Sequence, residues 1–194
     1  MTNWTHLIRF RAVEDGQVHL GQLVDTSRDV GIDCLNGVEV KAFLINGDVF
    51  NGTVTQNIFT VDHVRYKQIP NTHERLIKIF AKLLSPVSRE QCNYIRCLGL
   101  NYRDHAETLG VKAIYNGQTV QDGNTKNMIF SVRKQISSLS RGTTLEAGTV
   151  VLTGTPAGIG YFHNPRVSLE AGSQIEIQIE KIGTLVNEVK YDVI

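Results

Sequence analysis

Regular alternation of apolar and polar residues, broken by glycine, is the feature that most constrains this chain. In "SQIEIQIEKIG" (173–183), Ile175, Ile177 and Ile179 fall on one face of an extended strand, with glutamine and glutamate on the other. Asp15-Gly16 separates two further alternating runs, and this dipeptide supplies the positive φ angles of a tight hairpin turn. The pattern predicts a chain built mainly of β-strands.

The first 64 residues follow the same pattern. In "GVEVKAFLINGDVFNG" (37–52), Val38, Val40 and Ala42 share one face of a strand, and two glycine-containing turn signals follow. We therefore expect a small N-terminal β domain over residues 1–64.

Residues 65–84 break the pattern. Leu76, Ile77 and Phe80 recur at helical spacing, and a residue such as Asn71 or Thr72 can cap the first turn. We expect a helical insertion or linker over residues 65–92, with a membrane-binding or partner-binding helix as the less favoured alternative.

From residue 93 onward the β pattern returns. The segment "YIRCLGLNY" (94–102) predicts a buried strand, and "GTVVLTG" (148–154) predicts a second one. Only "NTKNMIFSVRKQISSLSRG" (124–142) favours a helix, which we expect to stop at Gly142. Its apolar stripe consists of Ile129, Val132, Ile136 and Leu139.

Charge and cysteine content exclude several classes of protein. The 194 residues include 20 lysines and arginines and 19 aspartates and glutamates, so the net charge of +1 favours neither nucleic acid nor an anionic membrane as a partner. No apolar run approaches the length of a membrane span. Cys34, Cys92 and Cys97 match no zinc spacing and suit a reducing compartment. We expect a cytoplasmic protein, and a mitochondrial location stays open.

A polar cluster follows the first of the C-terminal strands, in "LGLNYRDHAE" (98–107). His105 lies between Asp104 and Glu107, and a neighbouring carboxylate raises the pKa of an imidazole and fixes its tautomer, as a general base requires. In the alternative interpretation, Asp104 caps a helix and Arg103 forms an ion pair. The residues alone do not decide between the two.

A second polar segment, "TGTPAGIG" (153–160), follows the other strand. Its glycines allow several backbone N–H groups to face one concave turn, and Thr153 and Thr155 add hydroxyl donors. Such a turn can hold a carboxylate. It lacks the Gly-Lys-Ser/Thr ending of a phosphate loop, and a glycine-rich turn without a ligand is the equally weighted alternative.

Four sequence blocks together resemble the fumarylacetoacetate hydrolase superfamily. They are "RCLGLNYRDHAE", "NTKNMIFSV", "LSRGTTLEAGTVVLTGTPAGIG" and "LEAGSQIEIQIEKIGTLVNEV". The resemblance implies a β-rich α+β fold, the fumarylacetoacetase-like mixed β-roll, with its catalytic domain over residues 93–194. It also implies a homodimer that acts on 2-oxo or 1,3-diketo acids with Mg²⁺ or Mn²⁺ as cofactor. The implied reactions are C–C bond hydrolysis and the decarboxylation or tautomerisation of oxaloacetate.

The resemblance also implies roles for individual residues. His105 corresponds to the catalytic base, and Glu107 stands near its acidic partner, although the family pattern places that acid where this chain has Thr108. Thr155 resembles the threonine that binds the substrate carboxylate. The other expected substrate-binding residues are Tyr102, Arg103, Gly154 and Gly158.

The metal ligands expected from the resemblance are missing. Family members hold the metal with a Glu-x-Glu pair on one strand, but none of the 19 acidic residues here is followed two positions later by another. The chain passes from "HAETLGVK" directly to "AIYNGQTVQDGN". We therefore expect an internal truncation near residues 111–113, an incomplete core and no metal site. A retained intron at 65–84 and a skipped exon at 111–113 would explain both irregularities.

Three functions stay open on these grounds. The chain is an enzyme of the superfamily that uses His105, an inactive variant that dimerises with an intact relative, or a carboxylate-binding β domain that uses Thr155 alone. Because missing strands would leave apolar edges unpaired, we also expect poor solubility or association between copies.

Overall fold

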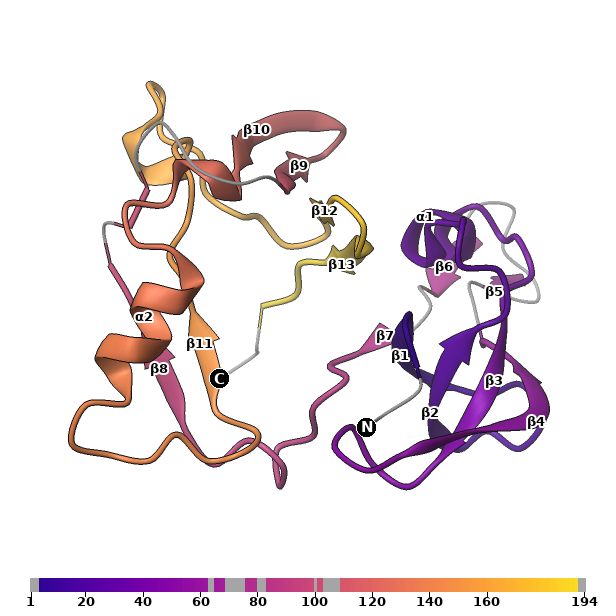
Figure 1. Cartoon of the computed structure of the whole chain (residues 1–194). Helices are drawn as coiled ribbons and strands as arrows, with labels where there is room; N and C mark the ends of the chain where they lie inside the picture. Colours follow the sequence, from indigo (N-terminus) through magenta and orange to yellow (C-terminus); the bar gives the residue numbers. More distant parts are fainter. Residues whose placement is uncertain are drawn as a thin grey trace. The chain divides into compact units, whose positions relative to one another are not determined.

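Sheets dominate the structure of this chain, a computed structural model that describes residues 4–62, 65–68, 76–79, 83–99, 101–102 and 109–191. The chain forms two units, Met1–Pro86 with Ile182–Asn187, and Val87–Lys181 with Glu188–Ile194 (Figure 1). Strands outnumber helices in both the N-terminal and the C-terminal parts. The β-rich α+β fold predicted from the sequence is confirmed.

The first unit contains a five-stranded antiparallel sheet with the strand order β4-β3-β2-β1-β7. Its strands are β1 (Leu7–Arg11), β2 (Val18–Leu23), β3 (Lys41–Asn46), β4 (Thr53–Thr60) and β7 (Leu83–Leu84). β1 and β2 form the hairpin predicted at Asp15-Gly16, where Gly16 has a φ of 69°. Gly47, with a φ of 105°, lies in the turn between β3 and β4.

The core of this unit combines strand residues with the short helix α1 (Val30–Leu35). Val40 and Ala42, which the sequence places on one face, are both buried. Asp29 begins α1, and its carboxylate accepts hydrogen bonds from the backbone N–H groups of Gly31 and Ile32 at 3.0 and 3.2 Å. The same carboxylate accepts bonds from the N–H and the hydroxyl of Thr184 at 3.0 and 2.7 Å.

The helix predicted over residues 65–84 is wrong for the residues described there. β5 (Arg65–Gln68) and β6 (Leu76–Ile79) pair as antiparallel strands, and β7 pairs with β1. The β-branched isoleucines of β6 favour strands, and a short helix without tertiary contacts is only marginally stable in water. The free edge of β1 pairs with β7, where Leu83 packs against the core.

A four-stranded sheet has the order β10-β9-β12-β13. Its strands are β9 (Gly110–Tyr115), β10 (Gln118–Asn124), β12 (Gln174–Ile179) and β13 (Gly183–Glu188). The two strands expected from the isoleucine alternation and Gly183 are therefore confirmed. Residues 111–113, the expected junction, lie inside β9, which pairs with β10 on one side and β12 on the other.

β8 (Ile95–Cys97) and β11 (Val150–Leu152) form a separate parallel pair. The sequence predicts a buried strand here, and that prediction is wrong, because Ile95 is 62% exposed. Parallel strands are ordinarily covered on both faces. The described part of the chain leaves Tyr94, Ile95 and Leu152 exposed to solvent.

Helix α2 (Val132–Leu139) begins after Ser131, whose hydroxyl accepts a bond from the Lys134 N–H at 3.4 Å. Its predicted apolar stripe does not face a core, since Val132 and Ile136 are 46% and 47% exposed. Gln135 is buried instead, because its side-chain amide donates to the Phe130 carbonyl at 2.6 Å. Two 3₁₀ helices, η1 (Thr125–Asn127) and η2 (Gly160–Phe162), complete the fold. None of the helices described is long and apolar enough to cross a membrane.

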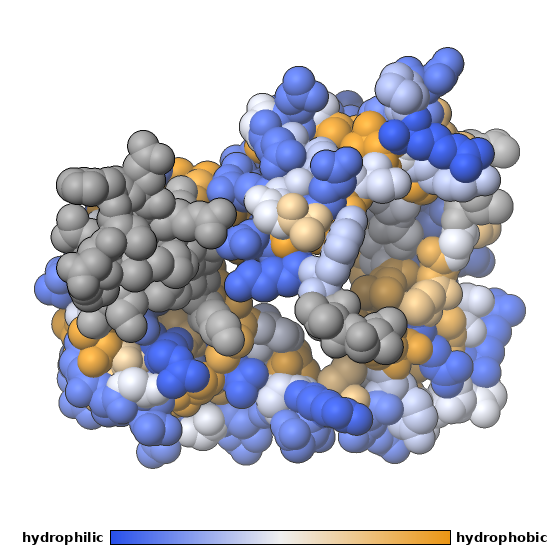
Figure 2. Space-filling view, turned by 180° about the vertical axis from the view of Figure 1, so that it is seen from behind, coloured by the Kyte–Doolittle hydropathy of each residue, from blue (hydrophilic) through white to orange (hydrophobic). Residues whose placement is uncertain are grey.

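Buried apolar side chains are distributed unevenly along the described residues. All of them lie between Ile8 and Val61, except Ala113 and Pro156. Hydrophobic surface is visible among hydrophilic side chains in the space-filling view (Figure 2). This distribution agrees with the incomplete core expected from the sequence.

Candidate functional site

Two polar segments that the sequence singled out separately come together beside β8 and β11. Because these strands are parallel, their carboxyl ends lie at the same edge, so the chain leaves β8 toward Asn101 and leaves β11 into residues 153–160. We call residues 153–160 the threonine loop. A Cβ atom at Gly154 would lie 3.2 Å from the Asn101 Cβ and 3.4 Å from the Tyr102 ring. Gly154 and Tyr102, two of the predicted site residues, are therefore neighbours.

Asn101 fixes one side of the threonine loop. It is 1% exposed, and its Nδ2 donates to the Thr153 carbonyl at 2.8 Å. Its Oδ1 accepts from the Phe130 N–H at 2.9 Å, and its own carbonyl accepts from the Ile129 N–H at 2.8 Å. One buried amide thus joins the segment after β8, the loop and the segment before α2.

Strand β10 fixes the other side of the loop. Gln121 Nε2 lies 3.1 Å from the Thr155 hydroxyl oxygen, 2.9 Å from the Pro156 carbonyl and 3.4 Å from the Ala157 carbonyl. A Cβ atom at Gly123 would come within 2.4 Å of the Pro156 ring, so the buried proline packs directly on this glycine. The loop is therefore held by β10 as well as by Asn101.

The loop glycines are required by its backbone. Gly154 and Gly158 have φ angles of 106° and 100°, which L side chains rarely adopt. A Cβ atom at Gly158 would stand 2.5 Å from the Val120 carbonyl oxygen. His163 Nε2 lies 3.1 Å from the Gly158 carbonyl. Gly158 thus approaches the protein's own backbone closely.

The threonine loop offers hydrogen-bond donors. Within the part of the chain that the structure describes, the backbone N–H groups of Gly154, Thr155, Ala157 and Gly158 donate no hydrogen bond. The Thr155 hydroxyl accepts from Gln121, and no described residue accepts its proton. Thr155 is exposed. Unpaired donors on a rigid loop favour an anionic ligand.

Three predicted site residues, Arg103, His105 and Glu107, lie outside the described residues, as does Thr108. Sequence reasoning did not identify Gln121 or His163 as partners of the loop. Gln121 lies just before the block that begins at Asn124. This position was the one sequence feature that could have indicated its role.

The described residues do not fit the Mg²⁺ or Mn²⁺ site that the resemblance implies. They include no group of three histidine, cysteine, aspartate or glutamate side chains that could hold a metal ion. The groups around the threonine loop are amides, a hydroxyl and carbonyls, whereas Mg²⁺ is usually bound through one or two carboxylates. No chemical step is therefore assigned to a metal.

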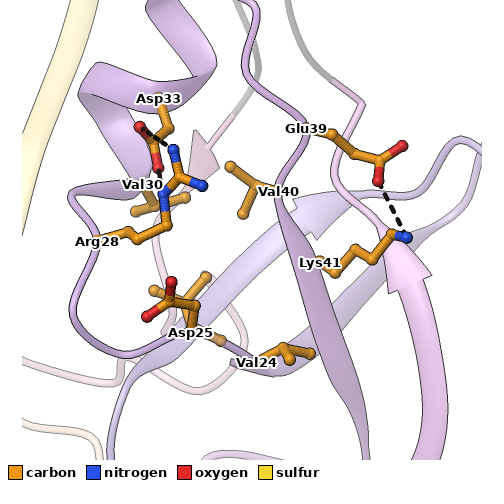
Figure 3. A pocket seen from close by; sticks show the side chains of 9 residues that line it. Val24, Asp25, Arg28, Val30, Asp33, Glu39, Val40 and Lys41 are labelled. Carbon is orange, nitrogen blue, oxygen red and sulfur yellow. Dashed lines mark hydrogen bonds and ion pairs between the residues drawn. The ribbon is translucent and has the colours of Figure 1, made fainter.

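A hollow of about 190 Å³ lies in the first unit, and none of the predicted site residues lines it (Figure 3). Four of its charged groups form two ion pairs. Arg28 Nε lies 2.6 Å from Asp33 Oδ2, and Lys41 Nζ lies 3.0 Å from Glu39 Oε1. The carboxylate of Asp25 also lines the hollow, and it accepts hydrogen bonds from the N–H and the hydroxyl of Ser27 at 3.0 and 2.6 Å.

Residues 103–190 match the family described as fumarylacetoacetate (FAA) hydrolase C-terminal. The chain is 26% identical to caffeoylpyruvate hydrolase of Neonothopanus nambi, over 97% of this chain and 94% of that protein. The alignment extends over 291 residues, more than the 194 of this chain, so the relative holds residues without a counterpart here. Over 83 residues the chain is 45% identical to oxaloacetate tautomerase YisK of Bacillus subtilis (strain 168), which covers 43% of this chain and 28% of that protein.

Solved structures show the same fold. A 2-hydroxyhepta-2,4-diene-1,7-dioate isomerase from Mycobacterium marinum has a TM-score of 0.61 at 16% identity and covers 95% of this chain and 98% of its own. At this level of identity the likeness concerns the fold.

Proposed function

This chain belongs to the fumarylacetoacetate hydrolase superfamily, and from that premise we propose that its threonine loop binds the carboxylate of a small 2-oxo acid. The observation that carries the proposal is the hydrogen bond from Gln121 to Thr155, beside backbone N–H groups that donate to no described residue. Hydrogen bonds from such donors to a carboxylate are charge-assisted and about twice as strong as neutral ones.

The reaction we propose is keto–enol tautomerisation of the bound 2-oxo acid. His105 removes a proton from the carbon beside the keto group, and the carbonyl oxygen gains a proton as the enol forms, so nothing is added or lost. Glu107 orients His105, and Tyr102 and Arg103 contact the substrate. The 45% identity to an oxaloacetate tautomerase over 83 residues supports this reaction, which needs no activated water.

Tautomerisation of oxaloacetate, followed by enol absorbance, tests this function. We expect His105→Ala to lower kcat by about 10²-fold or more, since general base catalysis contributes that much. We expect Thr155→Val to raise KM. Equal activity of wild type and His105→Ala would contradict the proposed reaction.

C–C bond hydrolysis is the second candidate, because the match to a caffeoylpyruvate hydrolase extends over nearly the whole chain. An assay with acylpyruvates in the presence of Mg²⁺ distinguishes the two. Cleavage that requires added Mg²⁺ would favour metal-dependent hydrolysis by this chain. The homodimer, the location and the domain limits likewise stay predictions.

A further inference from the structure

Strand β10 is irregular where it meets the threonine loop. Its pairing with β9 shifts register between Thr119 and Gln121, which makes Val120 the extra residue of a bulge. Bulges bend a strand and re-aim the side chains beside them. Here the Val120 carbonyl lies against Gly158, and the next side chain, Gln121, reaches three consecutive loop residues.

The contacts of Gln121 determine which end of its amide faces the loop. The carbonyl oxygens of Pro156 and Ala157 can only accept hydrogen bonds, so the NH₂ group must face them. The same nitrogen lies 3.1 Å from the Thr155 hydroxyl oxygen. Because an NH₂ group donates and does not accept, Thr155 must accept this bond.

The orientation of the Gln121 amide therefore determines the role of the Thr155 hydroxyl. A hydroxyl whose oxygen accepts from an amide must direct its own proton elsewhere. Within the described residues, nothing accepts that proton. The exposed Thr155 hydroxyl is left as a donor for a ligand.

We propose that Gln121 is a positioning residue that fixes Thr155 as a hydrogen-bond donor, so that the threonine loop selects ligands that only accept, such as carboxylates. The identity of the ligand rests on the proposed function. The orientation of the Thr155 hydroxyl by Gln121 does not rest on the proposed function. The orientation and the identity of the ligand are therefore tested separately.

The first test needs no ligand. Three-bond NMR couplings report the χ1 rotamer of Thr155 in wild type, in Gln121→Met and in the control Gln118→Met, an exposed glutamine of the same strand. We expect one rotamer in wild type and in Gln118→Met, and rotamer averaging in Gln121→Met. A single, unchanged rotamer in Gln121→Met would overturn the proposal.

The second test titrates pyruvate in EDTA and follows the amide signals of Gly154 and Gly158. Loss of a hydrogen bond that serves a charged ligand weakens binding by about tenfold, so we expect this effect in Gln121→Met and none in Gln118→Met. If Gln121 acts through the Thr155 hydroxyl, adding Gln121→Met to Thr155→Val does not weaken pyruvate binding further. Full additivity of the two substitutions would show an independent structural role and refute the proposal.

The outcomes separate the two ideas. If wild type does not bind pyruvate, the proposed function fails, and the rotamer test still judges Gln121. If Gln121→Met does not fold, Gln121→Glu replaces it, because this isosteric side chain accepts instead of donating. We then expect weakened pyruvate binding with Gln121→Glu, and unchanged binding would overturn the proposal.

Discussion

Asn101 illustrates what single residues reveal about this site and what they do not. The block "LGLNYRDHAE" and the segment 153–160 were both predicted to follow strand ends, and the structure brings Tyr102 and Gly154 together there. The burial of Asn101 was not predictable, because its partners are backbone groups at distant positions, which leave no sequence signature. The same holds for Gln121.

At Gly158, substitution is expected to be unusually costly. Gly158→Ala combines a positive φ angle with a contact of 2.5 Å to the Val120 carbonyl, so we expect a loss of about 3 kcal/mol of unfolding free energy. Gly117 is the matched control, since it has a φ of 79° and open space around it. Gly117→Ala should cost about 1 kcal/mol. Equal losses in urea unfolding would show that the Val120 contact does not matter.

Cys34 is expected to make stability depend on pH in the alkaline range. Burial, with the nearby charges of Asp33 and Asp29, raises the pKa of its thiol from 9.0 to about 12. Between these values the unfolded chain releases the proton while the folded chain keeps it. The stability present below pH 9 should therefore fall by about 1.4 kcal/mol per pH unit as the pH rises toward 12.

Comparison with Cys34→Ala isolates this contribution, because other groups titrate equally in both proteins. We expect wild type to lose unfolding free energy more steeply than the variant between pH 9 and pH 11. Parallel curves would contradict the raised pKa.

At the scale of elements, local sequence patterns predicted the structure correctly where strands adjacent in sequence pair. They gave the wrong structure or the wrong buried face where contacts with distant residues determine it. The hairpin at Asp15-Gly16 needs only its turn and its two strands, and it was predicted. The segment 76–79 has apolar residues at helical spacing and also contains β-branched residues. It forms a strand because it pairs with β5. Helix α2 was predicted, but its buried face was not, because Gln135 is held by a backbone carbonyl.

The exposed strand β8 carries a prediction about association. Ile95 is 62% exposed on one of two parallel strands, and such apolar strands associate in water. We expect sedimentation velocity to show association that grows with wild-type concentration and that Ile95→Lys reduces. The control is Ile182→Lys, since Ile182 is 69% exposed but lies in a turn between strands. A monodisperse wild-type monomer with a cooperative melt would refute this.

For the whole molecule, we propose that the threonine loop binds a carboxylate in a chain whose described residues include no cluster of side chains able to hold a metal ion. The fold and the match to the family were predictable because the four sequence blocks are long and occur in order. The chain is shorter than its alignment with caffeoylpyruvate hydrolase, and its described C-terminal unit buries little apolar surface. The internal truncation near residues 111–113, which lie inside β9, stays a prediction.

The most direct test of this claim is calorimetric titration of the full chain with pyruvate, once in EDTA and once with excess Mn²⁺. We expect the same dissociation constant in both titrations, and binding about tenfold weaker in Thr155→Val. Binding that occurs only with Mn²⁺ would contradict it.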